Sequence, residues 1–150
     1  HSAGVAVPVF SLRTEDGFGV GEFSDIKKLG DWANDAKLSV IQILPINDTT
    51  ANYTWTDSYP YAAISVYALH PQYLSVEKLE YALPKKLVKE YQDKKAELNA
   101  LSLIDYEQMI SGKWKFAKAV FEENQEAILK DKNFKKFIKD NEEWLMPYSA

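Results

Sequence analysis

Two short apolar runs, separated by one amphipathic segment, most limit the folds open to this chain. Residues 5–10 read VAVPVF and residues 40–44 read VIQIL, and each run is typical of a strand buried on both faces. Between them Ile26 and Leu29 begin an apolar stripe at helical spacing, with Ser24 as a candidate N-cap. Two strands joined by a crossover helix predict a parallel β–α–β unit.

This unit is incomplete as a sheet. Pro8 argues against a central position for the first strand, because proline cannot donate a hydrogen bond to a neighbouring strand. An edge, a bulge or an irregular first strand of a barrel would tolerate it. Two strands do not make a stable parallel sheet alone, so we expect further strands from outside the chain or from another copy. Exposed strand edges also predict self-association.

The second half of the chain has a different character. Residues 76–150 carry fourteen basic and fourteen acidic groups and a single glycine, which predicts charged helices. Pro84 opens a predicted helix over residues 85–99, and Asp105 caps a longer one reaching about residue 130. Residues 134–138 suggest a further short helix. The expected buried stripe of the long helix is Met109, Ile110, Trp114, Ala117, Phe121, Ile128 and Leu129.

Composition excludes several classes of function. The net charge is −4, so nucleic acid and anionic membrane are not expected partners. The chain has no cysteine, and its two histidines are His1 and His70, so neither a disulfide framework nor a Cys- or His-rich metal site is predicted. No apolar run reaches the roughly 18–20 residues that span a bilayer. We expect no cofactor and no metal.

A glycine-rich loop, residues 17–21, follows the first strand and precedes the predicted helix. Its G-x-G-x-G spacing differs from the dinucleotide fingerprint and lacks the lysine of a phosphate-binding loop. Glu15, Asp16 and Glu22 make the loop acidic, which would repel phosphate. We interpret these glycines as structural, serving turns that need positive φ.

The segment after the second strand is the best candidate for a binding site. Its Trp55, Asp57, Ser58, Tyr59 and Tyr61 lie within seven residues. Aromatic rings stack on the apolar faces of pyranoses, and short polar groups bond sugar hydroxyls. In an α/β barrel such a loop lies at the carboxyl ends of the strands, where ligands bind. The alternative is a surface loop that packs on itself. For His70, which precedes Pro71, a structural hydrogen-bonding role is favoured over that of a catalytic base.

Four blocks of this sequence, in order, resemble those of the amylomaltases, the 4-α-glucanotransferase family. The similarity covers nearly the whole chain and is strongest over residues 4–74. The spellings VPVFSLR, FGVGEF and WLMPY are similar to the plant cytosolic disproportionating enzymes and their bacterial relatives. The blocks are Ser11-Leu12, Phe18-Gly19-Val20-Gly21, Gln42-Ile43-Leu44-Pro45 and Asp57-Ser58-Tyr59-Pro60-Tyr61.

The resemblance implies an α/β fold, a partial (β/α)8 barrel, and cytoplasmic transfer of α-1,4-glucan segments with retention. Two carboxylates would carry that chemistry, and in the family they lie on later strands, so no catalytic residue is expected in this chain. Tyr61 matches a tyrosine that stacks beneath the sugar, and Asp57 and Ser58 match the neighbouring polar pair. Trp55 falls where some members have an aromatic platform for glucan.

This sequence departs from the family pattern in three places. Tyr59 is inserted into the D-S-P-Y block, and His70 stands where many members have asparagine. The helical region is long. We therefore expect residues 1–75 to begin a catalytic barrel and residues 76–150 to be a helical insertion between barrel strands.

The chain is expected to be an inactive fragment of a 4-α-glucanotransferase that supplies substrate-binding loops. Maltose, maltodextrin or a glycogen-like acceptor would be the α-1,4-glucan partners. Two alternatives stay open. One is a non-catalytic helical interaction module, in which the aromatic loop is only packing, and the other is a related α-glucan hydrolase.

Overall fold

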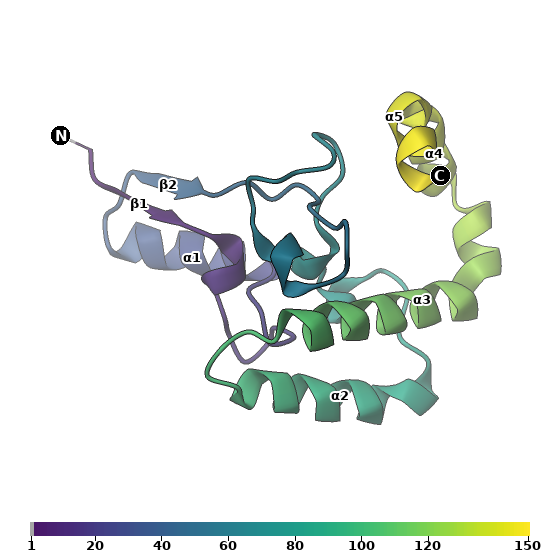
Figure 1. The fold of residues 1–150 in the computed structure, drawn as a ribbon, viewed down its shortest axis with the longest axis horizontal. Helices are drawn as coiled ribbons and strands as arrows, with labels where there is room; N and C mark the ends of the chain where they lie inside the picture. The colour runs from purple at the N-terminus through teal and green to yellow at the C-terminus, as the bar shows by residue number, and fades with distance from the viewer. Residues whose placement is uncertain (1) are drawn as a thin grey trace.

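The computed structural model describes residues 2–150. A small sheet with its crossover helix lies at one end of the molecule, a helical pair lies in the middle, and two short helices lie at the other end (Figure 1). Single turns of 3₁₀ helix occur in the loops. The strands are β1 (Gly4–Val7) and β2 (Val40–Ile43), and the helices are α1 (Phe23–Asp35), α2 (Lys85–Ala100), α3 (Tyr106–Lys130), α4 (Lys132–Asp140) and α5 (Glu142–Ser149).

The predicted β–α–β unit is present. Strands β1 and β2 pair in parallel, with Gly4 opposite Val40 and Val7 opposite Ile43, and α1 is the crossover between them. Helix α1 runs beside the strand pair (Figure 1). The α/β class expected from the two apolar runs is therefore confirmed.

The expected burial of these strands on both faces is wrong for the described residues. Both strands alternate between exposed and half-buried positions, and Val40 is 54% exposed. Strand β1 also ends at Val7, because Pro8 has no N–H for the ladder and a 3₁₀ turn follows. The physical reason is that successive side chains of a strand point to opposite faces, and within the described residues one face of this two-stranded sheet stays uncovered.

Helix α1 begins two residues before the position expected from Ser24 as N-cap. Glu22 is the N-cap, and its backbone N–H donates to Asp25 Oδ2 at 2.8 Å. A carboxylate in the first turn satisfies a free N–H group and complements the positive end of the helix. The Ser24 hydroxyl instead pairs with Ser75 Oγ at 2.9 Å, between α1 and the segment that leads to α2.

The helices of the second half follow their local signals. Pro84 precedes α2, as predicted. Asp105 caps α3, where its Oδ1 accepts from the Gln108 backbone N–H at 3.0 Å. Both ends of α3 agree with the prediction, and α4 contains the apolar cluster expected to form a short helix.

The core lies between α2, α3 and the glycine-rich loop. Phe18 from that loop stacks on Tyr91 of α2, with ring centroids 5.0 Å apart, and contacts Phe116 of α3 edge to face. The segments 1–75 and 76–150 therefore share one core. Its buried members are Phe18, Val20, Val76, Tyr91, Leu98, Tyr106, Met109, Ile110, Phe116 and Val120.

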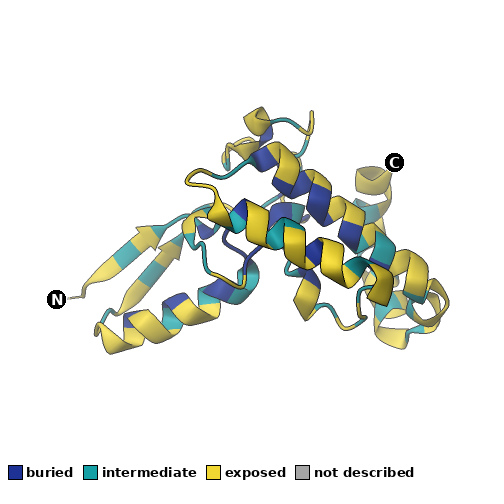
Figure 2. Ribbon diagram, turned by 90° about the horizontal axis from the view of Figure 1, so that it is seen from below, coloured by how far each residue is buried: buried dark blue, intermediate teal, exposed yellow. Residues whose placement is uncertain are grey.

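The buried face of α3 (Figure 2) differs in part from the predicted one. Met109 and Ile110 are buried as expected, whereas Trp114, Phe121 and Leu129 are exposed. Two overlapping apolar stripes run along this helix. The stripe that contains Phe116 and Val120 packs against α2 and Phe18. No helix within residues 2–150 is long and apolar enough to cross a bilayer.

Candidate functional site

The carboxyl end of β2 leads into a long loop, residues 47–69, which we call the aromatic loop. Its neck is closed by an isolated antiparallel bridge between Asn47 and Leu69. Beside this bridge the Asp48 N–H donates to the Ala68 carbonyl at 2.9 Å. The loop thus leaves and returns at one place, which fixes its position relative to the strands.

Asp57 holds the first part of the aromatic loop from inside. Its side chain is only 5% exposed, and Oδ2 accepts from the backbone N–H groups of Ala51, Asn52 and Tyr53 at 3.0, 2.9 and 2.7 Å. Burial alone would raise the pKa of this carboxyl, but the three N–H donors outweigh burial and lower it. Asp57 is therefore an ionised organiser of the loop backbone.

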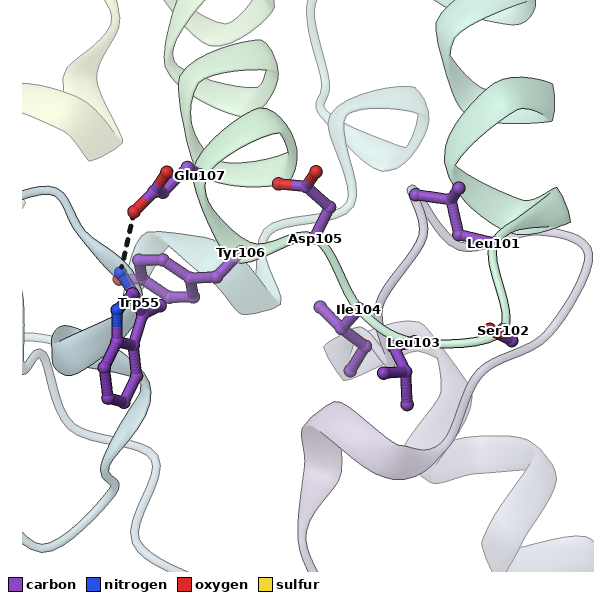
Figure 3. A pocket seen from close by; sticks show the side chains of 8 residues that line it. All are labelled: Trp55, Leu101, Ser102, Leu103, Ile104, Asp105, Tyr106 and Glu107. Carbon is purple, nitrogen blue, oxygen red and sulfur yellow. Dashed lines mark hydrogen bonds between the residues drawn. The ribbon is translucent and has the colours of Figure 1, made fainter.

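Trp55 lies on the outside of the same turn. Its indole is 70% exposed, and its backbone N–H donates to Glu107 Oε1 at 3.3 Å, which ties the loop to the start of α3. The Ser58 hydroxyl donates to the Trp55 carbonyl at 2.7 Å. Trp55 and residues 101–107 line an open pocket of about 420 Å³. Figure 3 shows Trp55 on one side of it and residues 101–105 on the other.

Two further aromatic rings project from the aromatic loop. Tyr59 and Tyr61 are both about 60% exposed, and their ring centroids lie 5.5 Å apart with planes inclined by 54°. Flat rings held open to solvent on a braced backbone suit contact with the faces of a saccharide. Such contact uses apolar area and leaves the sugar hydroxyls free to bond water or other polar groups.

The four residues predicted for the site thus take two positions. Trp55 and Tyr61 present their rings to solvent, whereas Asp57 and Ser58 direct their oxygens to the backbone of the loop itself. The sequence prediction missed the wall contributed by Leu101 and its neighbours. The signal that could have found it is an apolar cluster, LSLI, directly after a charged helix.

His70 lies at the base of the aromatic loop and is buried. Its Nδ1 accepts from the Gln72 backbone N–H at 3.1 Å, and Nε2 lies 3.2 Å from the Tyr106 hydroxyl. Burial lowers the pKa of His70, so the neutral ring is favoured. These contacts agree with the structural role expected for this histidine.

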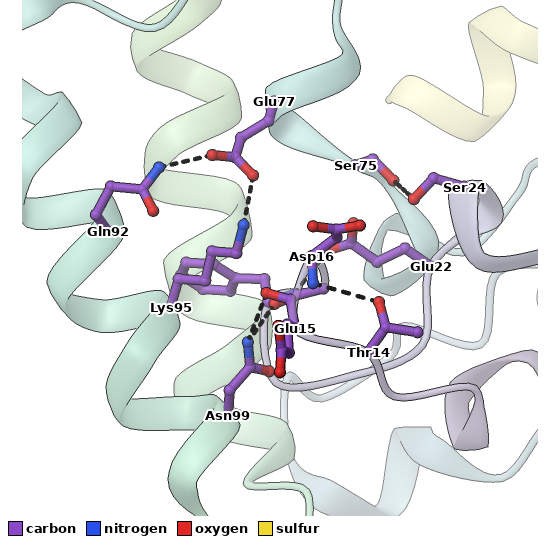
Figure 4. Close-up of polar contacts among 12 residues, drawn as sticks. Thr14, Glu15, Asp16, Glu22, Ser24, Ser75, Glu77, Gln92, Lys95 and Asn99 are labelled. Atoms are coloured by element: carbon purple, nitrogen blue, oxygen red, sulfur yellow. Dashed lines mark hydrogen bonds and ion pairs between the residues drawn. The ribbon is translucent and has the colours of Figure 1, made fainter. Parts of the chain in front are cut away.

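The donors of the glycine-rich loop are occupied within the protein. The Phe18 N–H donates to Glu22 Oε1, and the Gly19 N–H donates to Asn99 Oδ1 at 2.9 Å. The Asn99 amide in turn donates to the Gly17 carbonyl at 2.8 Å. It also donates to the Glu15 carbonyl at 3.3 Å (Figure 4). The predicted structural role is confirmed, but among the glycines of this loop positive φ occurs at Gly19 alone, with a φ of +75°, and not at Gly17 or Gly21.

Asp48 is the other buried carboxylate of the aromatic loop. Its Oδ1 accepts from the Thr50 N–H at 2.9 Å, and its Oδ2 accepts from the Tyr148 hydroxyl. Among residues 2–150, no three histidine, aspartate or glutamate side chains converge in a way that could hold a metal ion.

Comparison with known proteins gives one consistent result. The sequence model of a family described as 4-alpha-glucanotransferase matches residues 7–150. The 4-alpha-glucanotransferase DPE2 of Oryza sativa subsp. japonica is 45% identical over 150 residues, which are 100% of this chain and 16% of the rice protein. A 4-alpha-glucanotransferase of Chlamydia caviae is 34% identical over 148 residues, covering 98% of this chain and 27% of that protein. The chain thus spans less than a third of the length of these relatives.

Proposed function

The chain belongs to the 4-alpha-glucanotransferase family, and on that premise we propose that it supplies part of the glucan-binding surface of such an enzyme. The enzyme would move an α-1,4-glucan segment from one chain to the 4-hydroxyl of another. Maltose, maltodextrins and a glycogen-like acceptor are its proposed substrates, and a cytoplasmic location is part of the same proposal.

The observation that carries the proposal is the exposure of Trp55 and Tyr61 on a loop that follows a parallel strand. Apolar rings of this size cost free energy when they face water, and a ligand that covers them recovers it. Asp57 and Ser58 support the same surface indirectly, because their hydrogen bonds fix the backbone turn that carries Trp55.

We further propose that the catalytic carboxylates come from other parts of the protein. A retaining mechanism needs one carboxylate to attack the anomeric carbon and a second to act as acid and then base. The buried carboxylates of the aromatic loop are already engaged, since Asp57 binds three backbone N–H groups and Asp48 binds Tyr148. These contacts suit a supporting role better than chemistry.

The strand pair supports the proposal of a barrel. Strands β1 and β2 are parallel, and their unpaired edges offer hydrogen-bonding groups to further strands. In a (β/α)8 barrel both edges would be paired, and residues 76–150 would form an insertion between the second and third strands. For the 150-residue chain alone we propose self-association through the same edges. A strictly monomeric sedimentation profile over a wide concentration range would contradict this.

Two assays test the function. Titration of the chain with maltoheptaose, followed by tryptophan fluorescence, is expected to give a saturable response that Tyr61→Ala weakens and Tyr61→Phe retains. Tyr81→Phe is the matched control outside the aromatic loop. A flat response from the unmodified chain would favour an interaction module instead.

The second assay uses the longer enzyme. Incubation with maltose, with and without glycogen, is expected to release glucose and to lengthen the glucans. Products that are only shorter than the substrate would identify a hydrolase and overturn the proposed transfer.

A further inference from the structure

Helix α5 contacts both limbs of the aromatic loop, which are the outgoing limb that begins at Asn47 and the return limb that ends at Leu69. On the return limb, the Trp144 indole stacks on Tyr67, with ring centroids 5.5 Å apart and planes inclined by 22°. On the outgoing limb, the Tyr148 hydroxyl donates to Asp48 Oδ2. These contacts join residues that are 77 and 100 positions apart in the sequence. Helix α5 lies at the end of the molecule opposite the β1–β2 pair (Figure 1).

Asp48 joins three points of the aromatic loop. Its carboxylate accepts from the Thr50 N–H, its own N–H donates to Ala68, and its carbonyl accepts from the Ile64 N–H at 2.8 Å. The side chain is 3% exposed. A change at this carboxylate therefore acts on the start of the loop at Thr50 and on its return at Ile64 and Ala68.

Tyr148 suits the role of a permanent donor to this carboxylate. Partial loss of solvent around the phenol, with the Asp48 carboxylate beside it, raises the pKa of Tyr148, so the hydroxyl keeps its proton at neutral pH. A hydrogen bond from a neutral donor to a buried carboxylate is stronger than one between two neutral groups.

Helix α5 is not part of the core, since it has no buried residue. Packing of the core therefore does not explain why α5 contacts the aromatic loop. We propose that α5 is a positioning clasp, in which Tyr148 and Trp144 hold the two limbs of the aromatic loop so that Trp55 and Tyr61 keep their glucan-binding arrangement. The glucan part of this inference rests on the proposed function.

Tyr148→Phe tests the clasp with a single atom removed. We expect the Thr50 and Ile64 amides of the variant chain to exchange with deuterium about tenfold faster, because both donate to Asp48, which loses its hydrogen bond from Tyr148. Amides in α2 and α3 should be unchanged. Tyr91→Phe, which removes a hydroxyl from a ring packed in the core, is the matched control and should leave exchange in the aromatic loop unchanged.

A second readout concerns the glucan. Maltoheptaose is expected to bind Tyr148→Phe at least about threefold more weakly than the unmodified chain, a change of roughly half a log unit. Trp144→Phe, which keeps an aromatic ring over Tyr67, should retain affinity that Trp144→Ala loses. If α5 does not position the glucan-binding rings, both Trp144 variants should bind maltoheptaose with the same affinity.

The outcomes separate the two proposals. Unchanged exchange in the aromatic loop of Tyr148→Phe would overturn the clasp. Faster exchange with unchanged affinity would overturn its positioning role. If the unmodified chain binds no maltoheptaose while Tyr148→Phe still loosens the loop, the proposed function fails and the mechanical clasp stands.

Discussion

Lys113 Nζ lies 2.6 Å from Glu22 Oε1, and both side chains are almost completely buried. The same ammonium donates to the carbonyl oxygens of Gln72 at 2.6 Å and Leu74 at 2.8 Å. Glu22 Oε1 also accepts from the Phe18 N–H. This charged group therefore joins α3 to the start of α1 and to the segment that follows the aromatic loop.

The first prediction concerns that ion pair. Removing one partner of a buried pair leaves an uncompensated charge, which costs about 3–5 kcal/mol. We expect Lys113→Met to lower the free energy of unfolding by this amount in urea titrations. The exposed Lys115, paired with Glu90 on the surface, is the control, and Lys115→Met should change stability by less than about 1 kcal/mol. Equal effects of the two variants would contradict the prediction.

Nothing in the sequence marks Lys113 as buried. Lysine is almost never fully buried unless it is paired, and its partner lies 91 residues away along the chain. The ends of α2 and α3 were predictable because Pro84 and Asp105 act on the adjacent turn. The buried face of α3 depends on which neighbour it packs against, and local periodicity does not contain that information.

The candidate site shows the same division. The aromatic composition around Trp55 and Tyr61 predicts exposed rings that are suited to a sugar. The inward turn of Asp57 was not predictable, because it depends on three N–H groups brought together by a backbone in which Tyr53 adopts a φ of +58°. Pairing of β1 with β2 was predicted, but a pattern within 150 residues does not say what covers their other edges.

The second prediction concerns pH and His70. Burial lowers the pKa of His70; Asp48 and Asp57 oppose this shift and Lys113 adds to it. The unfolded chain therefore binds a proton at a higher pH, near about 6.5, than the folded chain does. The free energy of unfolding is expected to fall as the pH drops below about 6.5, by at most about 1.4 kcal/mol per pH unit, until the folded pKa is passed.

Urea titrations between pH 8 and pH 5 measure this dependence. His70→Gln is expected to remove the slope between pH 6.5 and 5.5, whereas His1→Gln should retain it. A slope that survives in His70→Gln but disappears in His1→Gln would assign the effect to the other histidine.

The third prediction concerns Asp57. Asp57→Ala removes the acceptor of three partly buried N–H bonds, and unsatisfied donors cost about 1–3 kcal/mol each when they stay fully buried. We expect the amides of Ala51, Asn52 and Tyr53 to lose protection from hydrogen exchange, together with a loss of about 2 kcal/mol in global stability. Ser58→Ala removes one exposed bond and should cost less than about 1 kcal/mol. Retained protection in Asp57→Ala would show that another group organises the turn.

The fourth prediction concerns Gly19. A Cβ at this position would lie 2.6 Å from Leu98 Cβ, and the φ of +75° is unfavourable for other residues. Gly19→Ala is expected to lower the free energy of unfolding by at least about 1–2 kcal/mol, which is the cost of left-handed backbone alone. Thermal unfolding measures it, and a melting temperature equal to that of the unmodified chain would contradict the packing of this loop on α2.

Gly30 offers the opposite case, and with it the last prediction. It lies inside α1, and a Cβ added there meets nothing within 4 Å. Because alanine favours a helix interior over glycine by about 0.8–1 kcal/mol, Gly30→Ala is expected to raise stability by nearly that amount. The melting temperature should rise by about 2–4 °C for a chain of this size. Measurement at low and high protein concentration adds a control for the proposed self-association. A gain at low concentration that reverses at high concentration would show that a second copy packs against this face of α1, whereas a loss at both would contradict the open space around Gly30.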